Sequence, residues 1–170
     1  VETGTLPATG VVNRAVELKS SNDLPPAVAQ KWKDHPDECS EDYGYGDLIK
    51  RFGGIAIGWD DEKTVKHNII PCGGPGAYNL VFAAFLFDEE TGSARNLQFP
   101  TMSEKGPSIV GTIINMSWDD NASQLSQFAK GRGLGDCGTA STWEWDGNAF
   151  YGNFVLVEER FQDECNGNYE

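Results

Sequence analysis

The sequence lacks the long apolar run that a membrane-spanning helix needs. No stretch of about 18 consecutive apolar residues occurs in the 170-residue chain. Basic side chains are also scarce, 13 against 26 acidic ones, which leaves a formal net charge of -13. Nucleic acids and anionic lipid surfaces attract clustered lysine and arginine, so neither is an expected partner. A cationic protein, a metal ion or a neutral sugar is compatible with this charge, although an acidic surface also serves solubility alone.

The residue patterns of nucleophilic catalysis are missing as well. The two histidines, His35 and His67, lie in no recognisable motif, and no serine stands in a Gly-x-Ser-x-Gly elbow. Acids are plentiful enough to supply a carboxylate pair for glycosidic chemistry, but abundance does not indicate placement. We therefore expect a protein without catalytic residues, and keep a carboxylate-dependent hydrolase as an alternative.

Close cysteine pairs, which structural zinc sites use, are also absent, although the chain has four cysteines: Cys39, Cys72, Cys137 and Cys165. An even number without Cys-x-x-Cys predicts two disulfides, and hence a periplasmic or secreted protein. Three connectivities are open. We favour Cys39 with Cys72 and Cys137 with Cys165, because each pair closes a loop of about 30 residues, worth roughly 3 kcal/mol in the chain-entropy model.

Hydrophobic patterning predicts an α+β fold, with an antiparallel β-sheet of about six to seven strands and two or three short helices. We expect residues 1–23 to form an extended N-terminal arm or edge strand, and residues 24–170 a single α+β domain. The helical spacing of apolar residues predicts helices at 24–35, 45–52 and 121–130, the first capped by Asp23. Runs rich in β-branched and aromatic residues predict strands at 55–59, 68–72, 78–87, 96–99, 109–118, 141–145 and 154–161.

The turns between these strands carry most of the acidic clusters. Residues 60–62, 88–90 and 119–121 are weak candidates for Ca²⁺, which needs about six to eight oxygens around one point. Their spacing is not that of a calcium loop, and solvated hairpin turns explain them better, so we expect no metal or other cofactor. Asp146-Gly147 signals a tight hairpin that would bring the last two cysteines to its open end.

Two features are candidates for binding. Trp143 and Trp145 are two residues apart on a predicted strand, so both project from one face, either as a platform for a sugar ring or peptide or packed against the early helices. Residues 130–138 hold four glycines together with Lys130 and Arg132, which is unusual in an acidic protein. That loop either holds an anion or lets Arg132 pair with a neighbouring carboxylate and lock the turn.

The run from Phe128 to Gly138, with residues 143–147 and 154–159 before Cys165, resembles the C-terminal signature of the bacterial domain-of-unknown-function family 1176. Pro71-Cys72-Gly73 and Gly76-Ala77-Tyr78-Asn79 match a second signature of that family. The resemblance implies an exported, extracytoplasmic bacterial protein that is typically longer, so that this chain is similar to the C-terminal half of one. The opening Val1-Glu2-Thr3-Gly4 is what we expect of a processed product. No established activity comes with the resemblance.

The leading hypothesis is a non-catalytic exported domain that binds a macromolecular partner, such as a cationic protein. The rival is a carbohydrate- or peptidoglycan-binding module that uses the two tryptophans and Tyr78. The candidate binding residues are Lys130, Arg132, Asp136, Trp143, Trp145, Tyr78 and Asn79.

Overall fold

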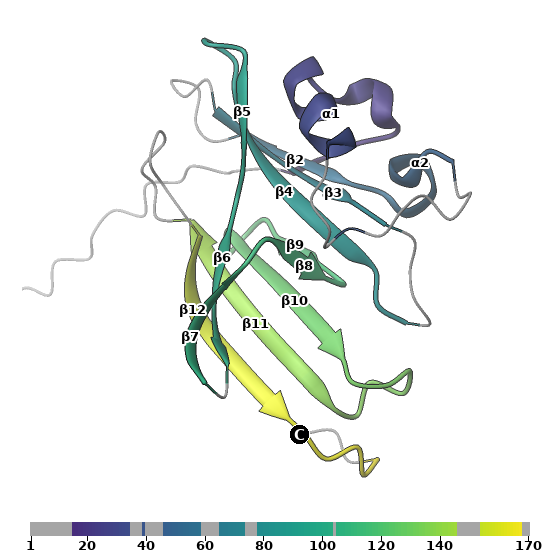
Figure 1. The fold of residues 1–170 in the computed structure, drawn as a ribbon, viewed down its shortest axis with the longest axis vertical. Helices are drawn as coiled ribbons and strands as arrows, with labels where there is room; N and C mark the ends of the chain where they lie inside the picture. The colour runs from purple at the N-terminus through teal and green to yellow at the C-terminus, as the bar shows by residue number, and fades with distance from the viewer. Residues whose placement is uncertain are drawn as a thin grey trace, which may run out of the picture.

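The computed structural model describes residues 15–34, 39, 46–58, 65–73, 78–103, 105–145 and 154–167. Within them the chain is mostly antiparallel β-sheet, with twelve strands and little helix (Figure 1). The elements are β1 (Ala15–Glu17), the 3-10 helix η1 (Ser21–Asp23), α1 (Pro26–Lys33), α2 (Leu48–Phe52), β2 (Ile55–Gly58), β3 (Val65–Pro71), β4 (Val81–Asp88), β5 (Ser93–Asn96), β6 (Phe99–Ser103), β7 (Gly106–Val110), β8 (Thr112–Ile114), β9 (Ser117–Asp119), β10 (Gln124–Lys130), β11 (Gly138–Trp145) and β12 (Phe154–Gln162). None of the helices in these ranges is long and apolar enough to cross a bilayer.

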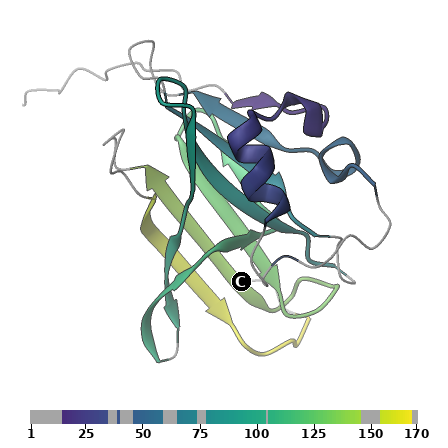
Figure 2. The ribbon, with the colours of Figure 1, turned by 45° about the horizontal axis from the view of Figure 1, so that its top comes forward.

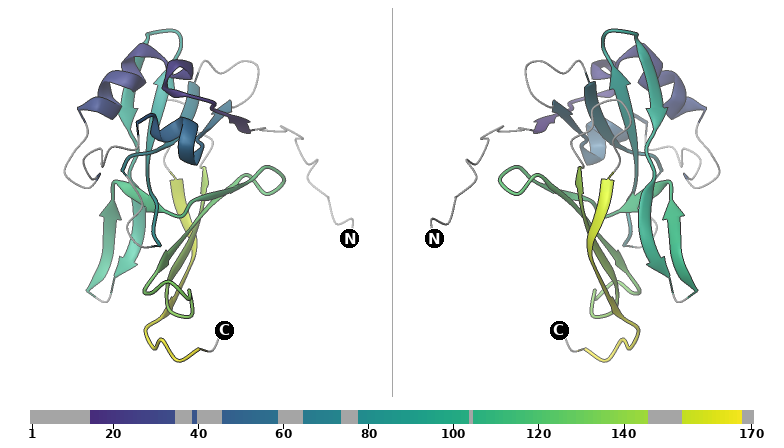
Figure 3. Two further views of the ribbon diagram at one scale, coloured as in Figure 1. Left: turned by 90° about the vertical axis from the view of Figure 1, so that its right-hand side faces the viewer. Right: turned by 90° about the vertical axis from the view of Figure 1, so that its left-hand side faces the viewer.

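The strands form two sheets and a ribbon. The first sheet has the order β1-β2-β3-β4-β5, with β8 also paired to β4. The second sheet has the order β12-β11-β10-β9, and β6 pairs with β7 as a two-stranded ribbon. Figure 3 shows the second sheet and the β6–β7 ribbon projecting on the same side of the first sheet. Antiparallel pairing is confirmed throughout, but the expected six to seven strands were too few.

The first sheet is buried on both of its faces. Along β4, Phe82, Ala84 and Leu86 belong to the core shared with the second sheet, while Ala83 and Phe85 belong to the core shared with the helices. This division follows from the period-two alternation of a strand. A strand covered on both sides is apolar at nearly every position, which is why β4 reads as a continuous hydrophobic run.

The helices cover the face of the first sheet that the second sheet leaves open. Val28 of α1 and Ile49 of α2 are buried there, and Figure 2 shows α1 lying across the sheet. Both helices are shorter than predicted. Asp23 does not cap α1, because its carboxylate completes a capping box with Ser20 around η1. Residues 15–17 pair with β2 at the edge of the first sheet, residues 1–14 lie outside the described part, and the domain division at residue 23 stays a prediction.

The predicted helix at 121–130 is wrong, because that segment contains the strand β10. Its apolar residues fit a helical spacing, but β10 pairs with β9 on one side and with β11 on the other. Leu125 points into the core, and Phe128, an odd number of residues away, lies on the opposite face of the sheet. Pairing along both edges outweighs a weak local helical preference.

Two predicted strands are divided by local backbone breaks, which, together with β1 and the unpredicted β10, accounts for the underestimated strand number. The segment 96–99 is split between β5, which ends at Asn96, and β6, which begins at Phe99. The N–H of Leu97 still donates to the carbonyl of Ala84 in β4 at 2.9 Å, so the chain leaves β4 only after this residue. The segment 109–118 contains the end of β7, then β8 and β9. Asn115 adopts a left-handed φ of 48° between β8 and β9, which interrupts an extended strand.

The predicted disulfides, Cys39–Cys72 and Cys137–Cys165, are both present. β11 and β12 pair as an antiparallel hairpin, which places the second disulfide near its open end as expected. The turn residues 146–153 and the acidic cluster 60–62 lie outside the described part of the chain. The other two acidic clusters do fall at hairpin turns, between β4 and β5 and between β9 and β10.

Candidate functional site

The loop of residues 131–137 connects β10 to β11 and is closed by its own backbone. The N–H of Gly131 donates to the carbonyl of Cys137 at 2.9 Å, and the N–H of Gly135 donates to the carbonyl of Arg132 at 2.9 Å. Gly138 has a φ of 140°, and a Cβ there would stand 2.1 Å from the carbonyl oxygen of Ala129. Only glycine fits where the loop returns to the sheet, which explains one of the glycines in this stretch.

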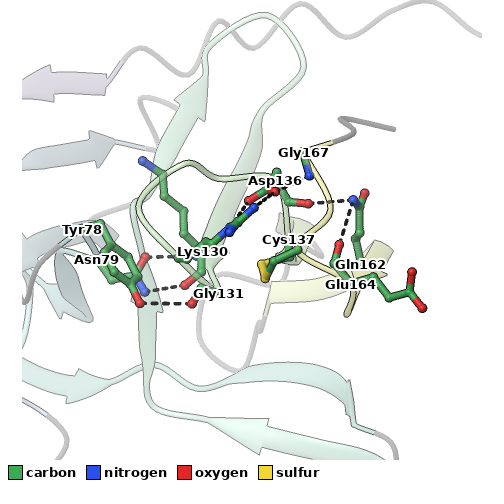
Figure 4. The surroundings of a disulfide bond; sticks show 11 residues. Tyr78, Asn79, Lys130, Gly131, Asp136, Cys137, Gln162, Glu164 and Gly167 are labelled. Carbon is green, nitrogen blue, oxygen red and sulfur yellow. Dashed lines mark hydrogen bonds and ion pairs between the residues drawn. A yellow bond between two sulfur atoms is a disulfide. The ribbon is translucent and has the colours of Figure 1, made fainter.

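Asp136 is the centre of a polar cluster at the base of this loop. Its carboxylate, with 0% of the side chain exposed, accepts two hydrogen bonds from the Arg132 guanidinium, one of them at 2.7 Å from Nε. It also accepts the N–H of Gly167 at 2.6 Å, and its backbone carbonyl accepts Nε2 of Gln162 at 2.7 Å (Figure 4). The Arg132 hydrogen bonds hold the pKa of Asp136 well below its usual range, against the opposing effect of burial.

This geometry distinguishes the two interpretations of the glycine-rich loop. Arg132 pairs with a carboxylate and locks the turn, so its guanidinium is engaged within the protein. Lys130 behaves differently: its backbone is bonded, and Figure 4 shows its side chain pointing away from Asp136 and Cys137. Anion binding by the two basic residues together has no support in this arrangement.

Tyr78 and Asn79 attach the other end of the loop to the first sheet. The hydroxyl of Tyr78 donates to the carbonyl of Gly131 at 3.1 Å. The side-chain amide of Asn79 donates to the carbonyl of Lys130 at 3.0 Å and accepts the N–H of Lys130 at 3.1 Å, as a neighbouring strand would (Figure 4). Asn115 joins this network by donating to Asn79 at 2.9 Å and to the carbonyl of Phe128 at 2.9 Å. The two family signatures therefore meet in space.

The structure does not support the predicted tryptophan platform. Trp143 is 0% exposed, its indole N–H donates to the carbonyl of Pro100 at 2.7 Å, and its ring packs on Phe99. Trp145 packs edge-on against His67, with ring centroids 4.1 Å apart. Both indoles project from one face as expected, but that face meets the first sheet and the β6–β7 ribbon. In the described part of the chain both indoles therefore belong to the core between the two sheets, and not to the core that the helices cover.

His67 lies in the same core and is fully buried. Burial, with a smaller contribution from the charge of Arg95, lowers the pKa of His67 to about 3. The imidazole is therefore neutral at physiological pH and enclosed by aromatic rings, which does not suit a general base that must reach a substrate.

A groove opens on the outer face of the second sheet, beside the 131–137 loop. We call it the outer-face groove; it has a volume of about 570 Å³ and is lined by Phe128, Gly135, Asp136, Cys137, Gly138, Ala140, Arg160, Phe161 and Gln162. Such a volume lies in the usual range of small-molecule sites, roughly 300–1,000 Å³. Asp136 is the one acid among these described lining residues, and its carboxylate is engaged, so the groove offers no carboxylate pair for hydrolysis.

One metal-type cluster appears among the described residues, formed by Asp136, Cys137 and Cys165, with candidate ligand atoms within 4.8 Å of one another. The two sulfur atoms are joined in a disulfide and are not thiolates, so this donor set does not suit a metal ion. Calcium at the acidic turns stays an untested prediction.

Comparison with known proteins identifies the family of this chain. The family model described as protein of unknown function (DUF1176) matches residues 5–170. The chain belongs to this family. A relative in Escherichia coli (strain K12), the uncharacterized protein YpfG, is 31% identical over 93 residues, which are 53% of this chain and 26% of YpfG. The chain thus spans only part of that relative's length, and no solved structure matches it.

Sequence reasoning found five residues that the structure brings together at the loop: Tyr78, Asn79, Lys130, Arg132 and Asp136. It missed Arg160 and Gln162 of the groove, as well as Asn115. Recognising β10 and β12 as the two neighbours of β11 would have placed Arg160 across Ala140 from Phe128, and Gln162 across Gly138 from Lys130. The signal for Asn115 is weaker. Asparagine adopts a left-handed backbone more readily than most residues, which is compatible with a strand break at this position.

Proposed function

We propose that this chain is a non-catalytic binding domain of an exported bacterial protein, and that its partner is a macromolecule of net positive charge. The placement of the carboxylates supports this best. The exposed acids of the described residues are Glu17, Asp23, Asp34, Glu89, Glu90, Asp119, Asp120, Glu144, Glu158, Asp163 and Glu164. Most of the described acids therefore carry their charge at the surface, where it attracts a cationic partner and accelerates its association.

The internal chemistry supports a role without catalysis. Asp136 is held by Arg132, His67 is buried among aromatic rings, and all four cysteines are in disulfides. These groups serve the fold, so they are not poised to attack a substrate. The disulfides also support export, because such bonds persist in oxidising compartments such as the periplasm.

Binding to a basic protein tests the proposal. We expect the oxidised chain to bind immobilised lysozyme at low ionic strength, and the dissociation constant to rise about tenfold or more between roughly 20 and 200 mM salt, because surface charges are screened. No binding at low salt, or binding indifferent to salt, contradicts the proposal.

Paired charge variants sharpen that measurement. Neutralising two exposed acids, Asp163→Asn with Glu164→Gln, is expected to slow association with little change in dissociation. Neutralising two exposed lysines, Lys31→Gln with Lys33→Gln, is the matched control and should have the opposite effect. Equal association rates in both variants would show that charge does not direct the encounter.

A further inference from the structure

We propose that the outer-face groove binds a neutral sugar ring. This inference does not rest on the proposed function, because it is argued from the shape and lining of the groove and is tested by sugar binding. The inference begins with the register of three neighbouring strands. Phe128 of β10 pairs with Ala140 of β11, which pairs with Arg160 of β12. Directly paired residues share one face of a sheet, so these three side chains form a row across the outer face.

The row has the shape of a trough. Ala140 and Gly138, the small residues of β11, form its floor. Phe128 stands on one side, and Arg160 and Gln162 stand on the other. The backbones of the two flanking strands are about 9–10 Å apart, which is twice the spacing of neighbouring strands. A single ring standing between these walls, with its face toward Phe128, suits that width.

The 131–137 loop closes one end of the trough. Gly135 lines the groove, and a Cβ built on it would lie 3.5 Å from the Phe128 ring, so the loop backbone approaches the end of the aromatic wall. The locked Arg132–Asp136 pair and the Cys137–Cys165 disulfide hold that backbone in place. The closed end is thus preformed, which reduces the entropy that a ligand must lose on binding.

The polar wall matches hydroxyl groups better than a charged group. Arg160, the one cation among the described lining residues, donates through Nε and Nη2 to Glu158 at 2.9 and 2.7 Å, so its charge is already neutralised by a carboxylate. The Arg160 guanidinium has further N–H donors beyond these two bonds, and a sugar hydroxyl can accept them. The strong negative charge of the whole protein also disfavours an anionic ligand.

Nuclear magnetic resonance titration tests the site directly. Cellotriose and triacetylchitotriose are the neutral probes, trigalacturonate is the acidic probe, and trialanine is the peptide probe. We expect at least one neutral trisaccharide to shift the amide signals of Gly138 and Ala140 saturably, with a dissociation constant on the order of 1 mM. The acidic sugar and the peptide should bind more weakly than that saccharide.

Variants separate the two walls and the floor. Phe128→Ala should weaken binding about tenfold through loss of the aromatic contact, and Arg160→Gln should weaken it through loss of donors. Ala140→Leu fills the floor and should abolish binding while every donor stays in place. Phe52→Ala and Arg51→Gln make matched changes on α2, on the other side of the first sheet, and should leave binding unchanged.

Circular dichroism and thermal melting identify any variant that fails to fold. Arg160 is 71% exposed, so its variant keeps the test open even if Phe128→Ala unfolds. The proposal is overturned if no neutral saccharide shifts Gly138 or Ala140 at about 20 mM, a concentration well above the expected dissociation constant. Tighter binding of trigalacturonate or trialanine, or unchanged binding by Ala140→Leu, overturns it equally.

Discussion

The first and second sheets differ in what covers them, and therefore in what holds them. The first sheet lies between the helices and the second sheet, and apolar burial fixes both of its faces. The second sheet is covered on one face, and its free end is held by the Asp136 cluster, the Cys137–Cys165 disulfide and the Asn79 bridge. Apolar burial stabilises the first sheet. In the second sheet, discrete polar and covalent links hold a solvent-facing surface in a preformed shape.

Removing one ring from each sheet gives the largest expected contrast. Phe85 in the first sheet is 0% exposed, so Phe85→Ala should lower the free energy of unfolding by about 3–5 kcal/mol. The same substitution at the exposed Phe161 of β12 should change it by less than about 0.5 kcal/mol. Chemical denaturation of both variants measures the difference, and losses of similar size would remove the contrast between the sheets.

Removing each disulfide in turn separates the loss of overall stability from the loosening of the 131–137 loop. Replacing Cys137 and Cys165 by serine opens a link across 28 residues and should cost roughly 3–4 kcal/mol in the chain-entropy model. Replacing Cys39 and Cys72 should cost a similar amount, since that link spans 33 residues.

The two disulfide variants should differ in hydrogen exchange. We expect faster amide exchange in the 131–137 loop only when the second disulfide is absent, because that bond is adjacent to the loop. Equal protection of the loop in both variants would show that the bond does not shape it. Four free thiols in freshly isolated protein would contradict disulfides and export together.

Acid should affect the two regions in different pH ranges. His67 has a pKa of about 3 in the folded protein, below its usual 6.5. As the pH falls, the unfolded chain therefore binds a proton at this residue before the folded protein does. The free energy of unfolding decreases as a result between pH 6.5 and pH 3. The loss should reach about 2 kcal/mol at pH 5. Asp136 also has a lowered pKa, but its contribution is present above 3.8 and is lost only below that pH.

A histidine variant provides the check on this order. His67→Leu should flatten the stability curve between pH 7 and 5, measured by denaturation at each pH, while the wild-type curve slopes. A wild-type curve already flat in that range would mean that protonation of His67 does not destabilise the protein. The loop amides should stay protected until the pH falls below about 3.8, the usual pKa of an aspartate.

Predictability from sequence followed the range of the interactions involved. The strands near residues 55, 81 and 154 and the β11–β12 pairing are visible in local composition and turn residues. The β10 strand is not, because Leu125, Phe128 and Ala129 fit a helix as well as a strand, and only pairing with β9 and β11 distinguishes the two. The Arg132–Asp136 pair joins residues only four apart, so the sequence already indicated a turn locked by Arg132 and a neighbouring carboxylate as one alternative.

The sequence by itself determined the disulfide-linked, acidic and strand-rich character of this protein, because those properties depend on residue types and on spacing along the chain. Tertiary structure alone decided which face of the second sheet is buried. Packing against the first sheet placed Trp143 in the core and left Phe128 on the outer face, since a strand presents alternate residues to opposite sides and the local sequence does not say which side meets a partner layer.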